Sequence, residues 1–275
     1  MAIQLIAMDM DGTLLDDDHA TVPLRNAAAL RSARERGVKL AIASGRTWSL
    51  LQDAAKQVGG VDYAILANGA SIWDTKGERY IYEDGIPNAQ AVELIQGLEG
   101  EDLVFEIYCE GQNYILEQNV GRLADGLLSP QFAEIYLKRG VKLVSDLVQA
   151  LGGRSMEKIN LFHVPAEKKE KVCALARATG PVEISNALER NLEINFGGAS
   201  KGKALAALAA HLGLKPEEVM AFGDANNDLA MLRWAGWSFA MANAMPEAKA
   251  VAKYQTASNH EAGVGQAVEK FVLGE

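Results

Sequence analysis

Cysteine, histidine and long apolar runs are scarce in this sequence. Only Cys109 and Cys173 occur among the 275 residues, and they lie far apart in the chain. A disulfide framework or a structural zinc site needs clustered ligands, so neither is expected. The apolar stretch Ile3–Met8 has no basic residue before it and ends at Asp9, so it predicts neither a signal peptide nor a membrane-spanning helix. We expect a cytoplasmic protein that does not bind a membrane.

Basic residues are also fewer than acidic ones. Lys and Arg number 27 against 36 Asp and Glu, which gives a formal net charge of −9. Binding to a nucleic-acid backbone draws on clustered Lys and Arg, which are not seen here, so nucleic acid is not an expected partner. An acidic protein can still bind a phosphate ester where a metal ion, a lysine and backbone N–H groups neutralise the charge locally.

Short apolar runs alternate with helical patterns in the two outer parts of the chain. This alternation predicts a parallel, Rossmann-like α/β sheet. The strands predicted there are Ile3–Met8, Val38–Ala43, Tyr63–Ala67, Val219–Phe222 and Ser238–Met241. The helices are Pro23–Arg36, Trp48–Val58, Lys203–Leu212 and Asp228–Ala235.

The middle of the chain has a different pattern, in which hairpins and helices mix as in an α+β module. We therefore predict a discontinuous Rossmann-like core, residues 1–83 and 191–275, with an inserted α+β cap domain at residues 84–190. The predicted helices of the middle part are Asn88–Leu98 and Glu167–Ala178. The predicted strands are Leu103–Tyr108, Tyr114–Leu116, Lys158–Val164, Val182–Ser185 and Leu192–Asn195.

The first predicted strand ends in Asp9-Met10-Asp11-Gly12-Thr13. Side chains alternate along an extended chain, so Asp9 and Asp11 point to one side and Met10 to the other. Two carboxylates then meet at the carboxyl edge of a parallel sheet, where open α/β folds bind their ligands. A bare Asp-x-Asp is more often a solvated turn. The buried strand before it and the Gly-Thr-Leu after it favour a functional site.

Polar residues follow other predicted strands as well. Ser44 and Gly45 offer a hydroxyl and N–H groups that could bind an anion, although an ordinary strand-to-helix turn looks the same. Asn68-Gly69 follows the third strand and is likewise ordinary as a turn. These residues are of interest because they are expected at the same edge of the sheet as Asp9 and Asp11.

A late strand is followed by Gly223-Asp224-Ala225-Asn226-Asn227-Asp228. Magnesium prefers near-octahedral oxygen coordination from one or two carboxylates, waters and phosphate. Asp9, Asp224 and the main-chain carbonyl of Asp11 would meet that preference. Asp228 could orient a water or Asn227 from outside the ligand shell. The alternative is that Asn226 or Asn227 simply caps the following helix.

The segment Gly197–Ala204 permits two interpretations. It matches the G-x-x-x-x-G-K core of a phosphate-binding P-loop between a strand and a helix. Ala204 stands where that motif needs a magnesium-binding hydroxyl, and a nucleotide P-loop would leave the two aspartates of the first motif without a role. We therefore assign Lys201 to the substrate phosphate and leave Lys203 solvated.

Together these motifs resemble the haloacid dehalogenase (HAD) superfamily of phosphatases, and specifically its Cof-type branch (subclass IIB) with a large inserted cap. The resemblance covers nearly the whole chain, although the cap carries no motif. Asn226 departs from a common Glu and Lys253 from a common Asp. The matching residues are Asp9–Thr13, Ser44, Lys201 and Gly223–Asp228 in the order of the four family motifs, with Asn68-Gly69-Ala70 and Met241–Ala244 as further signatures.

The resemblance implies a magnesium-dependent phosphatase for small-molecule phosphate esters such as sugar phosphates. Asp9 would attack phosphorus and form an aspartyl phosphate. Asp11 would protonate the departing alkoxide and then activate the hydrolytic water. The groups implied to offset transition-state charge are the metal, Lys201, Ser44, Asn227 and the N–H groups of Met10 and Gly45.

Three alternatives stay open at this stage. They are a phosphomutase of related fold, a nucleotide-dependent ATPase, and a binding module without catalysis, because fold does not fix function. An isomerised product would identify the first, phosphate release without ATP would exclude the second, and metal-dependent turnover would exclude the third. The sequence identifies no substrate, and it does not decide which of Tyr108, Tyr114, Lys158, Asn160 or His163 in the insert would contact one.

Overall fold

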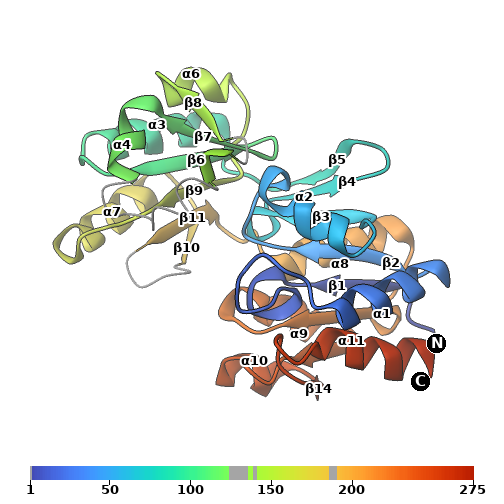
Figure 1. The fold of residues 1–275 in the computed structure, drawn as a ribbon. Helices are drawn as coiled ribbons and strands as arrows, with labels where there is room; N and C mark the ends of the chain where they lie inside the picture. The colour runs from blue at the N-terminus through green and yellow to red at the C-terminus, as the bar shows by residue number, and fades with distance from the viewer. Residues whose placement is uncertain (1, 124–135, 139–140, 186–190) are drawn as a thin grey trace. The chain divides into compact units, whose positions relative to one another are not determined.

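A computed structural model of the chain describes residues 2–123, 136–138, 141–185 and 191–275 (Figure 1). These residues form two compact units. The first, which we call the core, runs from the amino terminus to Tyr82 and from Ser200 to Glu275. The second, which we call the insert, is Glu83–Ala199. Each unit has its own sheet and its own buried apolar side chains.

The core contains an eight-stranded sheet with the order β14-β13-β12-β1-β2-β3-β4-β5. Neighbouring strands from β14 to β3 run parallel, and β4 pairs antiparallel with β3. β1 is central, with Leu5 opposite both Val219 of β12 and Lys39 of β2. The strands are β1 Leu5–Met8, β2 Lys39–Ala43, β3 Tyr63–Leu66, β4 Ser71–Asp74, β5 Arg79–Glu83, β12 Val219–Gly223, β13 Trp237–Ala240 and β14 Tyr254–Gln255.

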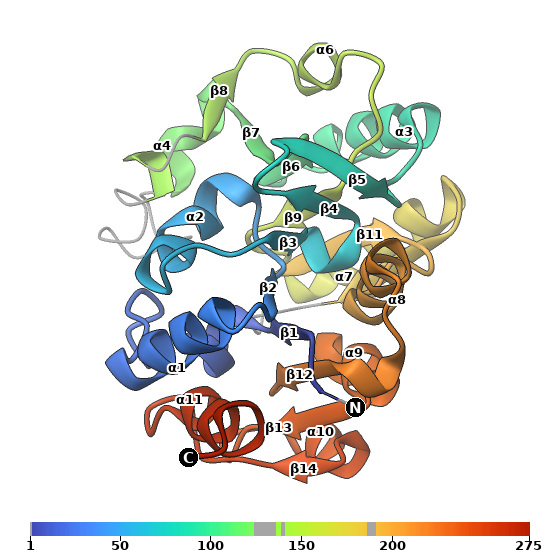
Figure 2. The same ribbon diagram turned by 90° about the vertical axis from the view of Figure 1, so that its right-hand side faces the viewer.

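Helices cover both faces of the core sheet. The side chains of Ile6 and Met8 pack on one face with α1, α2 and α11, while those of Leu5 and Ala7 pack on the other with α8 and α9. Figure 2 shows the two groups of helices on the left and right of the core strands. The helices are α1 Leu24–Glu35, α2 Trp48–Gln57, α8 Lys201–Leu212, α9 Leu229–Trp234, α10 Pro246–Val251 and α11 Gly263–Val268.

The predicted Rossmann-like parallel sheet is thus confirmed. Central strands are buried on both faces, which is why their sequences read as continuous apolar runs. The strands β4, β5 and β14 were not predicted, because they are short and most of their residues are partly or fully exposed, apart from Ser71 and Ile72. In the part of the chain that the structure describes, no helix has the length and apolar character needed to cross a membrane.

The insert contains a six-stranded sheet with the order β10-β11-β9-β6-β7-β8. Its strands pair antiparallel except for the parallel pair β7 and β8. The strands are β6 Phe105–Cys109, β7 Gln112–Leu116, β8 Lys142–Val144, β9 Lys158–Leu161, β10 Val182–Ser185 and β11 Leu192–Phe196. The helices described are α3 Asn88–Glu99, α4 Val120–Arg122, α6 Leu147–Leu151 and α7 Ala166–Ala178.

The carboxyl-terminal boundary of the insert differs from the expected one. The predicted end of the inserted domain, residue 190, lies outside the described residues, and residues 191–199 were expected in the core. β11 instead pairs with β9 and β10, with Leu192 opposite Leu161 and Phe196 opposite Val182. The chain therefore returns to the core at Ser200. Periodicity identified β11 as a strand, but only its pairing partners show which sheet it joins.

One face of the insert sheet is polar. Glu106 lies buried on β6, and its carboxylate accepts hydrogen bonds from Tyr108, Asn113, Asn160 and Tyr136. Burial raises the pKa of Glu106, and the hydrogen bonds from Tyr136, Asn113 and Asn160 oppose that rise.

The pairing of the strands assigns four of the five undecided insert residues to one face of the sheet or the other. Tyr108 lies opposite Lys158, and its ring is 4.4 Å from the Lys158 Nζ. Tyr108, Lys158 and Asn160 therefore belong to the face that carries Glu106. Tyr114 packs instead against the apolar face that is covered by α3 and α7.

Candidate active site

Asp9 lies immediately after the central strand β1. Its backbone N–H donates to the carbonyl of Phe222 on β12 over 3.0 Å, which continues the strand pairing to this residue. Its carboxylate Oδ1 is 2.5 Å from the Nζ of Lys201 at the start of α8, and its side chain is 9% exposed. The side chain of Met10 points the other way into the apolar core. Asp9 thus lies at the carboxyl edge of the sheet, as predicted. The chain turns at Met10–Leu14 instead of staying extended, so the expected meeting of the Asp9 and Asp11 carboxylates is not observed.

Lys201 joins two carboxylates in a fully buried position. Its Nζ donates to Asp9 and, over 2.7 Å, to the Oδ1 of Asp228, and both Lys201 and Asp228 have side chains that are 0% exposed. Burial lowers the pKa of Lys201, but the charges of Asp228 and Asp9 raise it by more, so the ammonium form is favoured. The other oxygen of Asp228 accepts the N–H groups of Asp224 and Ala225 at 3.0 and 3.1 Å. Asp228 therefore holds both the lysine and the loop that follows β12.

Asp224 approaches the loop after Asp9. Its Oδ1 accepts a hydrogen bond of 2.9 Å from the Thr13 hydroxyl. A Cβ atom added at Gly12, where φ is +79°, would lie 2.5 Å from the Asp224 Oδ2, so only glycine allows this approach. The side-chain amide of Asn243 donates a further hydrogen bond of 2.8 Å to the Gly12 carbonyl.

The site contains more negative than positive charge. Ligand oxygens of Asp9, Asp224 and Asp228 lie within 4.8 Å of one another. Burial raises the pKa of Asp9 well above its usual value, Lys201 lowers it, and Asp228 and Asp224 raise it again. Burial and Asp228 raise the pKa of Asp224 to about 6, against the hydrogen bond from Thr13. Three close carboxylates with one ammonium group favour the binding of a cation or a proton.

Asp11 is held apart from this cluster by a residue that the sequence analysis did not assign. Its carboxylate receives two hydrogen bonds from the Arg46 guanidinium, Nη2 to Oδ1 at 2.5 Å and Nε to Oδ2 at 3.1 Å. The Nδ1 of His19 lies 3.2 Å from Oδ1. Two parallel charge-assisted hydrogen bonds set both the position and the orientation of a carboxylate.

Ser44 and Gly45 follow β2, and Asn227 lies beyond β12. The Ser44 side chain is buried and its Oγ accepts the N–H of Arg46 at 3.2 Å. The Asn227 amide donates to the Oδ1 of Asn68 over 3.2 Å. That oxygen would lie 2.9 Å from a Cβ at Gly45. Asn68 therefore brings the loops after β2, β3 and β12 together.

The P-loop alternative does not fit this geometry. The lysine that a P-loop would use is Lys203, which is exposed on α8, whereas Lys201 is the residue aimed at the carboxylates. Ser200 caps α8 by accepting the N–H of Lys203 at 3.1 Å. The segment is thus the capped start of a helix that delivers Lys201.

Several site residues had no predicted role. Thr13, Asn68 and Asn243 stood within motifs but carried no distinctive pattern of their own. Arg46 could have been noticed because it follows the Ser44-Gly45 turn, and an arginine beside an anion-binding turn is a natural partner for a carboxylate or phosphate.

Comparison with other proteins gives matches along almost the whole chain. The sequence model of the haloacid dehalogenase-like hydrolases matches residues 6–268. A 5-amino-6-(5-phospho-D-ribitylamino)uracil phosphatase of Bacillus subtilis (strain 168) is 30% identical over 98% of this chain and 96% of its own. A haloacid dehalogenase-like hydrolase from Bacteroides thetaiotaomicron has a TM-score of 0.82 and 27% identity, covering 98% of this chain and 99% of that one. A sugar phosphatase of HAD subclass IIB has a TM-score of 0.75 and 26% identity, covering 98% of each chain.

Proposed function

Because this chain belongs to the haloacid dehalogenase-like hydrolases and is a phosphatase of that family, we propose that it hydrolyses small-molecule phosphate monoesters through an aspartyl phosphate on Asp9. The observation that carries this proposal is the buried Asp9 carboxylate, held at the end of β1 by Lys201 and close to Asp224. An ionised carboxylate needs no activating base to act as a nucleophile, in contrast to a serine hydroxyl.

We propose Mg²⁺ as the cofactor, bound by the Asp9 and Asp224 carboxylates and the main-chain carbonyl of Asp11. The residues fit such an ion because the carboxylate cluster has an excess of negative charge and consists of oxygen ligands. Asp228 is already occupied by Lys201 and two backbone N–H groups, which supports a role outside the ligand shell. When bound, Mg²⁺ would neutralise phosphate charge and act as a Lewis acid.

Lys201 has two roles in this proposal. It orients the Asp9 carboxylate for attack on phosphorus through the hydrogen bond to Oδ1. Its positive charge also stabilises the transferring phosphoryl group. Asp228 keeps the ammonium group in place. The groups proposed to bind the phosphoryl oxygens are the Ser44 hydroxyl, the Asn227 amide and the N–H groups of Met10 and Gly45.

Asp11 is the proposed general acid and base. It must give a proton to the leaving alkoxide and later take one from water, and neither step is open to a carboxylate that keeps both of its hydrogen bonds to Arg46. We infer that Asp11 leaves Arg46 when substrate binds and returns to it after phosphate is released. Arg46 thereby keeps the acid out of the carboxylate cluster between turnovers.

The substrate class that we propose is a phosphate ester of a sugar, a sugar alcohol or a similar metabolite. Two of the relatives named above are, according to their names, phosphatases of a phosphoribitylamino compound and of a sugar phosphate. We propose that the insert selects among these esters, because every proposed catalytic residue belongs to the core. The described thiols of Cys109 and Cys173 are free, which supports a cytoplasmic location. We propose no nucleic-acid or membrane partner.

The test is phosphate release from a panel of sugar phosphates, nucleotides, flavin mononucleotide and pyridoxal phosphate. We expect release with Mg²⁺, loss of release after chelation, and recovery when Mg²⁺ is restored. An isomerised ester in place of free phosphate would identify a phosphomutase. Turnover by a protein shown to retain no metal would contradict the magnesium proposal.

Two variants separate the roles of the first-motif aspartates. Asp9→Asn should abolish turnover of every ester, since an amide is a poor nucleophile. Asp11→Asn should slow phosphoryl transfer from a sugar phosphate by about 10²–10⁴-fold, and far less from p-nitrophenyl phosphate, whose leaving group needs no proton. The measurement is a pre-steady-state burst, because the phosphoenzyme should accumulate in Asp11→Asn. Equal slowing of both esters, or a burst from Asp9→Asn, would reverse these assignments.

A further inference from the structure

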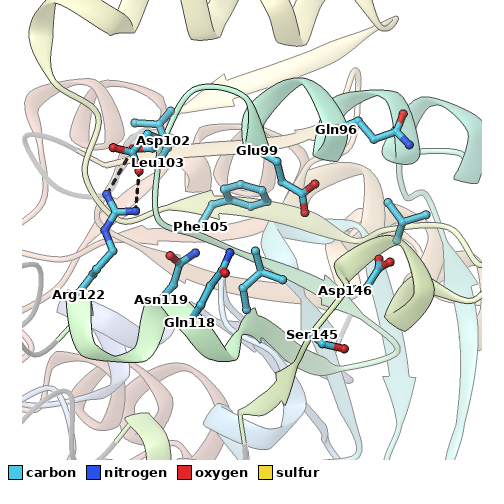
Figure 3. Close-up of a pocket in the computed structure, with 12 residues that line it drawn as sticks. Gln96, Glu99, Asp102, Leu103, Phe105, Gln118, Asn119, Arg122, Ser145 and Asp146 are labelled. Carbon is cyan, nitrogen blue, oxygen red and sulfur yellow. Dashed lines mark hydrogen bonds and ion pairs between the residues drawn. The ribbon is translucent and has the colours of Figure 1, made fainter.

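The insert contains a polar cavity of about 450 Å³, formed by α3, α6, β6, β7 and the residues that lead into α4 (Figure 3). This volume is in the range of pockets that bind small molecules. All of its lining residues belong to the insert, and none is among the proposed catalytic groups. The floor includes the buried side chains of Leu103, Phe105 and Leu116.

Asn119 is the clearest sign that this cavity binds a ligand. The residue is only 6% exposed, and within the described part of the chain its side chain forms no hydrogen bond. It occupies the cap position of α4 without capping that helix. Figure 3 shows its amide pointing into the cavity below Phe105. No fully buried side-chain N or O atom of the described residues lacks a hydrogen-bond partner, so the unpartnered Asn119 amide is reached by solvent from the cavity. It therefore has a donor and an acceptor available for a bound molecule.

The charge of the lining indicates what kind of molecule fits. Arg122 pairs with Asp102 through a hydrogen bond of 2.9 Å, so the one cation among the described lining residues is already paired with an acid. Glu99 and Asp146 also line the cavity, and neither has an ion-pair partner among the described residues. Asp146 uses one carboxylate oxygen to cap α6 through the N–H of Gln149. Both acids are exposed residues, and burial and then the charge of Asp146 raise the pKa of Glu99, which places the two carboxylates within electrostatic reach of each other.

The end of α3 strengthens this negative potential. Glu99 is the last residue of α3, and the last turn of that helix contains no basic residue. The carboxyl end of a helix carries partial negative charge and favours cations. Lys168 and Lys171 of α7 both bind Glu101, which does not line the cavity.

We propose that this cavity binds a small organic ammonium ion, with the cationic group held by Glu99 and Asp146 and a second polar group held by Asn119. The proposal concerns a site separate from the catalytic residues and does not depend on the phosphatase reaction. The chemical class is an aliphatic amine or diamine of metabolite size.

The test is isothermal titration of the full-length protein with 1,4-diaminobutane, and with 1,4-butanediol as a neutral analogue of similar size, at constant ionic strength. We expect the diamine to bind and the diol not to bind. Glu99→Gln, Asp146→Asn and Asn119→Leu should each weaken binding by about threefold to fivefold, the range of a partly exposed ion pair or a single hydrogen bond. Asp146→Asn keeps the helix cap, because Asn caps as well as Asp.

Glu93→Gln is the matched control, since Glu93 is an exposed acid of α3 that does not line the cavity. It should bind the diamine like the unaltered protein. All four variants should hydrolyse p-nitrophenyl phosphate at the unaltered rate, which shows that they are folded. Equal binding of diol and diamine, absence of diamine binding at millimolar concentration, or an affinity unchanged by Glu99→Gln would each overturn the proposal.

Discussion

At the scale of single residues, Lys201 shows how a functional group can also be a structural requirement. It lies within hydrogen-bond distance of two buried carboxylates that come from opposite ends of the core sequence. Desolvating a charge costs several kcal/mol unless a partner of opposite sign is close. The lysine that we propose to bind phosphate therefore also makes it possible to bury Asp9 and Asp228 together.

We expect Lys201→Met to be inactive and to lose about 3–5 kcal/mol of unfolding free energy, the cost of leaving a buried charge without its partner. Urea denaturation without Mg²⁺ measures this change. The double variant Lys201→Met/Asp228→Asn should recover part of the stability, because one uncompensated carboxylate has been removed, and it should stay inactive. If Lys201→Met were as stable as the wild-type protein, solvation or protonation of the Asp9 and Asp228 carboxylates would have to replace the charge of the lysine.

The pair of His260 and Asp16 gives a residue-level prediction that depends on pH. The His260 Nδ1 is 2.9 Å from the Asp16 Oδ1, and this hydrogen bond and the charges of Asp16 and Asp17 raise the pKa of His260. Protonation is thus favoured in the folded state. The resulting stabilisation is fully present below the unfolded-state pKa of about 6.5 and is lost as the pH rises through the higher folded-state value.

An NMR titration of the His260 ring should therefore give a pKa above the usual histidine value. Asp16→Asn should return it toward that value, since the amide cannot form the ion pair. A titration curve that is the same in both proteins would mean that the two side chains do not interact in solution.

At the scale of secondary-structure elements, the loop after β3 is fitted against the start of α8. Gly69 has a φ of +100°, and a Cβ atom there would lie 2.3 Å from the Ser200 carbonyl group. Because Gly69 has no side chain, the loop after β3 can pack directly against the start of the helix that carries Lys201. Through Asn68, the same loop contacts Asn227, which is proposed to bind phosphate.

We expect Gly69→Ala to destabilise the protein more than Gly37→Ala does. Gly37 also has a positive φ, +90°, but a Cβ there would meet nothing within 4 Å. The control should cost about 1–2 kcal/mol for the left-handed backbone conformation, and Gly69→Ala should cost about 1–3 kcal/mol more because α8 must shift. Denaturation midpoints of the two variants measure the difference. Equal midpoints would show that the loop and helix separate at little cost.

At the scale of the whole molecule, the boundary of the insert decides which exchanges of domains can fold. β11 is hydrogen-bonded on both sides within the insert sheet, although it follows a segment that the sequence analysis took as the end of that domain. If the rest of the insert came from another protein, β11 would have to pair with strands of a different sequence. The register of that pairing would be poorly specified.

We expect a chimera that replaces residues 83–199 with the insert of a relative to fold and to change which esters are hydrolysed. Its hydrolysis of p-nitrophenyl phosphate should stay close to the original rate, because the proposed catalytic groups lie in the core. A chimera that exchanges only residues 84–190 should be less stable, since β11 of this chain would have to pair with strands of the donor. Equal stability of the two chimeras, or an unchanged ester preference in the first, would contradict this division.

The parallel sheet, the inserted second unit and the places where polar residues follow strands could all be predicted from the amino-acid sequence. These features are local: an apolar run buried on both faces and the turn that ends it are visible within about ten residues. Asp9, Asp224 and Ser44 could be proposed as site residues because all of them stand directly after such runs. The family resemblance rests on the same local motifs.

Which of these residues come into contact could not be predicted before the fold was known. Lys201 reaches Asp9 across 192 positions of sequence, Arg46 reaches Asp11 across 35, and β11 finds its neighbours in the insert. Such contacts depend on strand order and on the direction in which each helix is packed, and neither is encoded in the periodicity of any one segment. The excess of negative charge at the site, and the unpartnered Asn119 in the insert, follow from burial, which only the assembled fold defines.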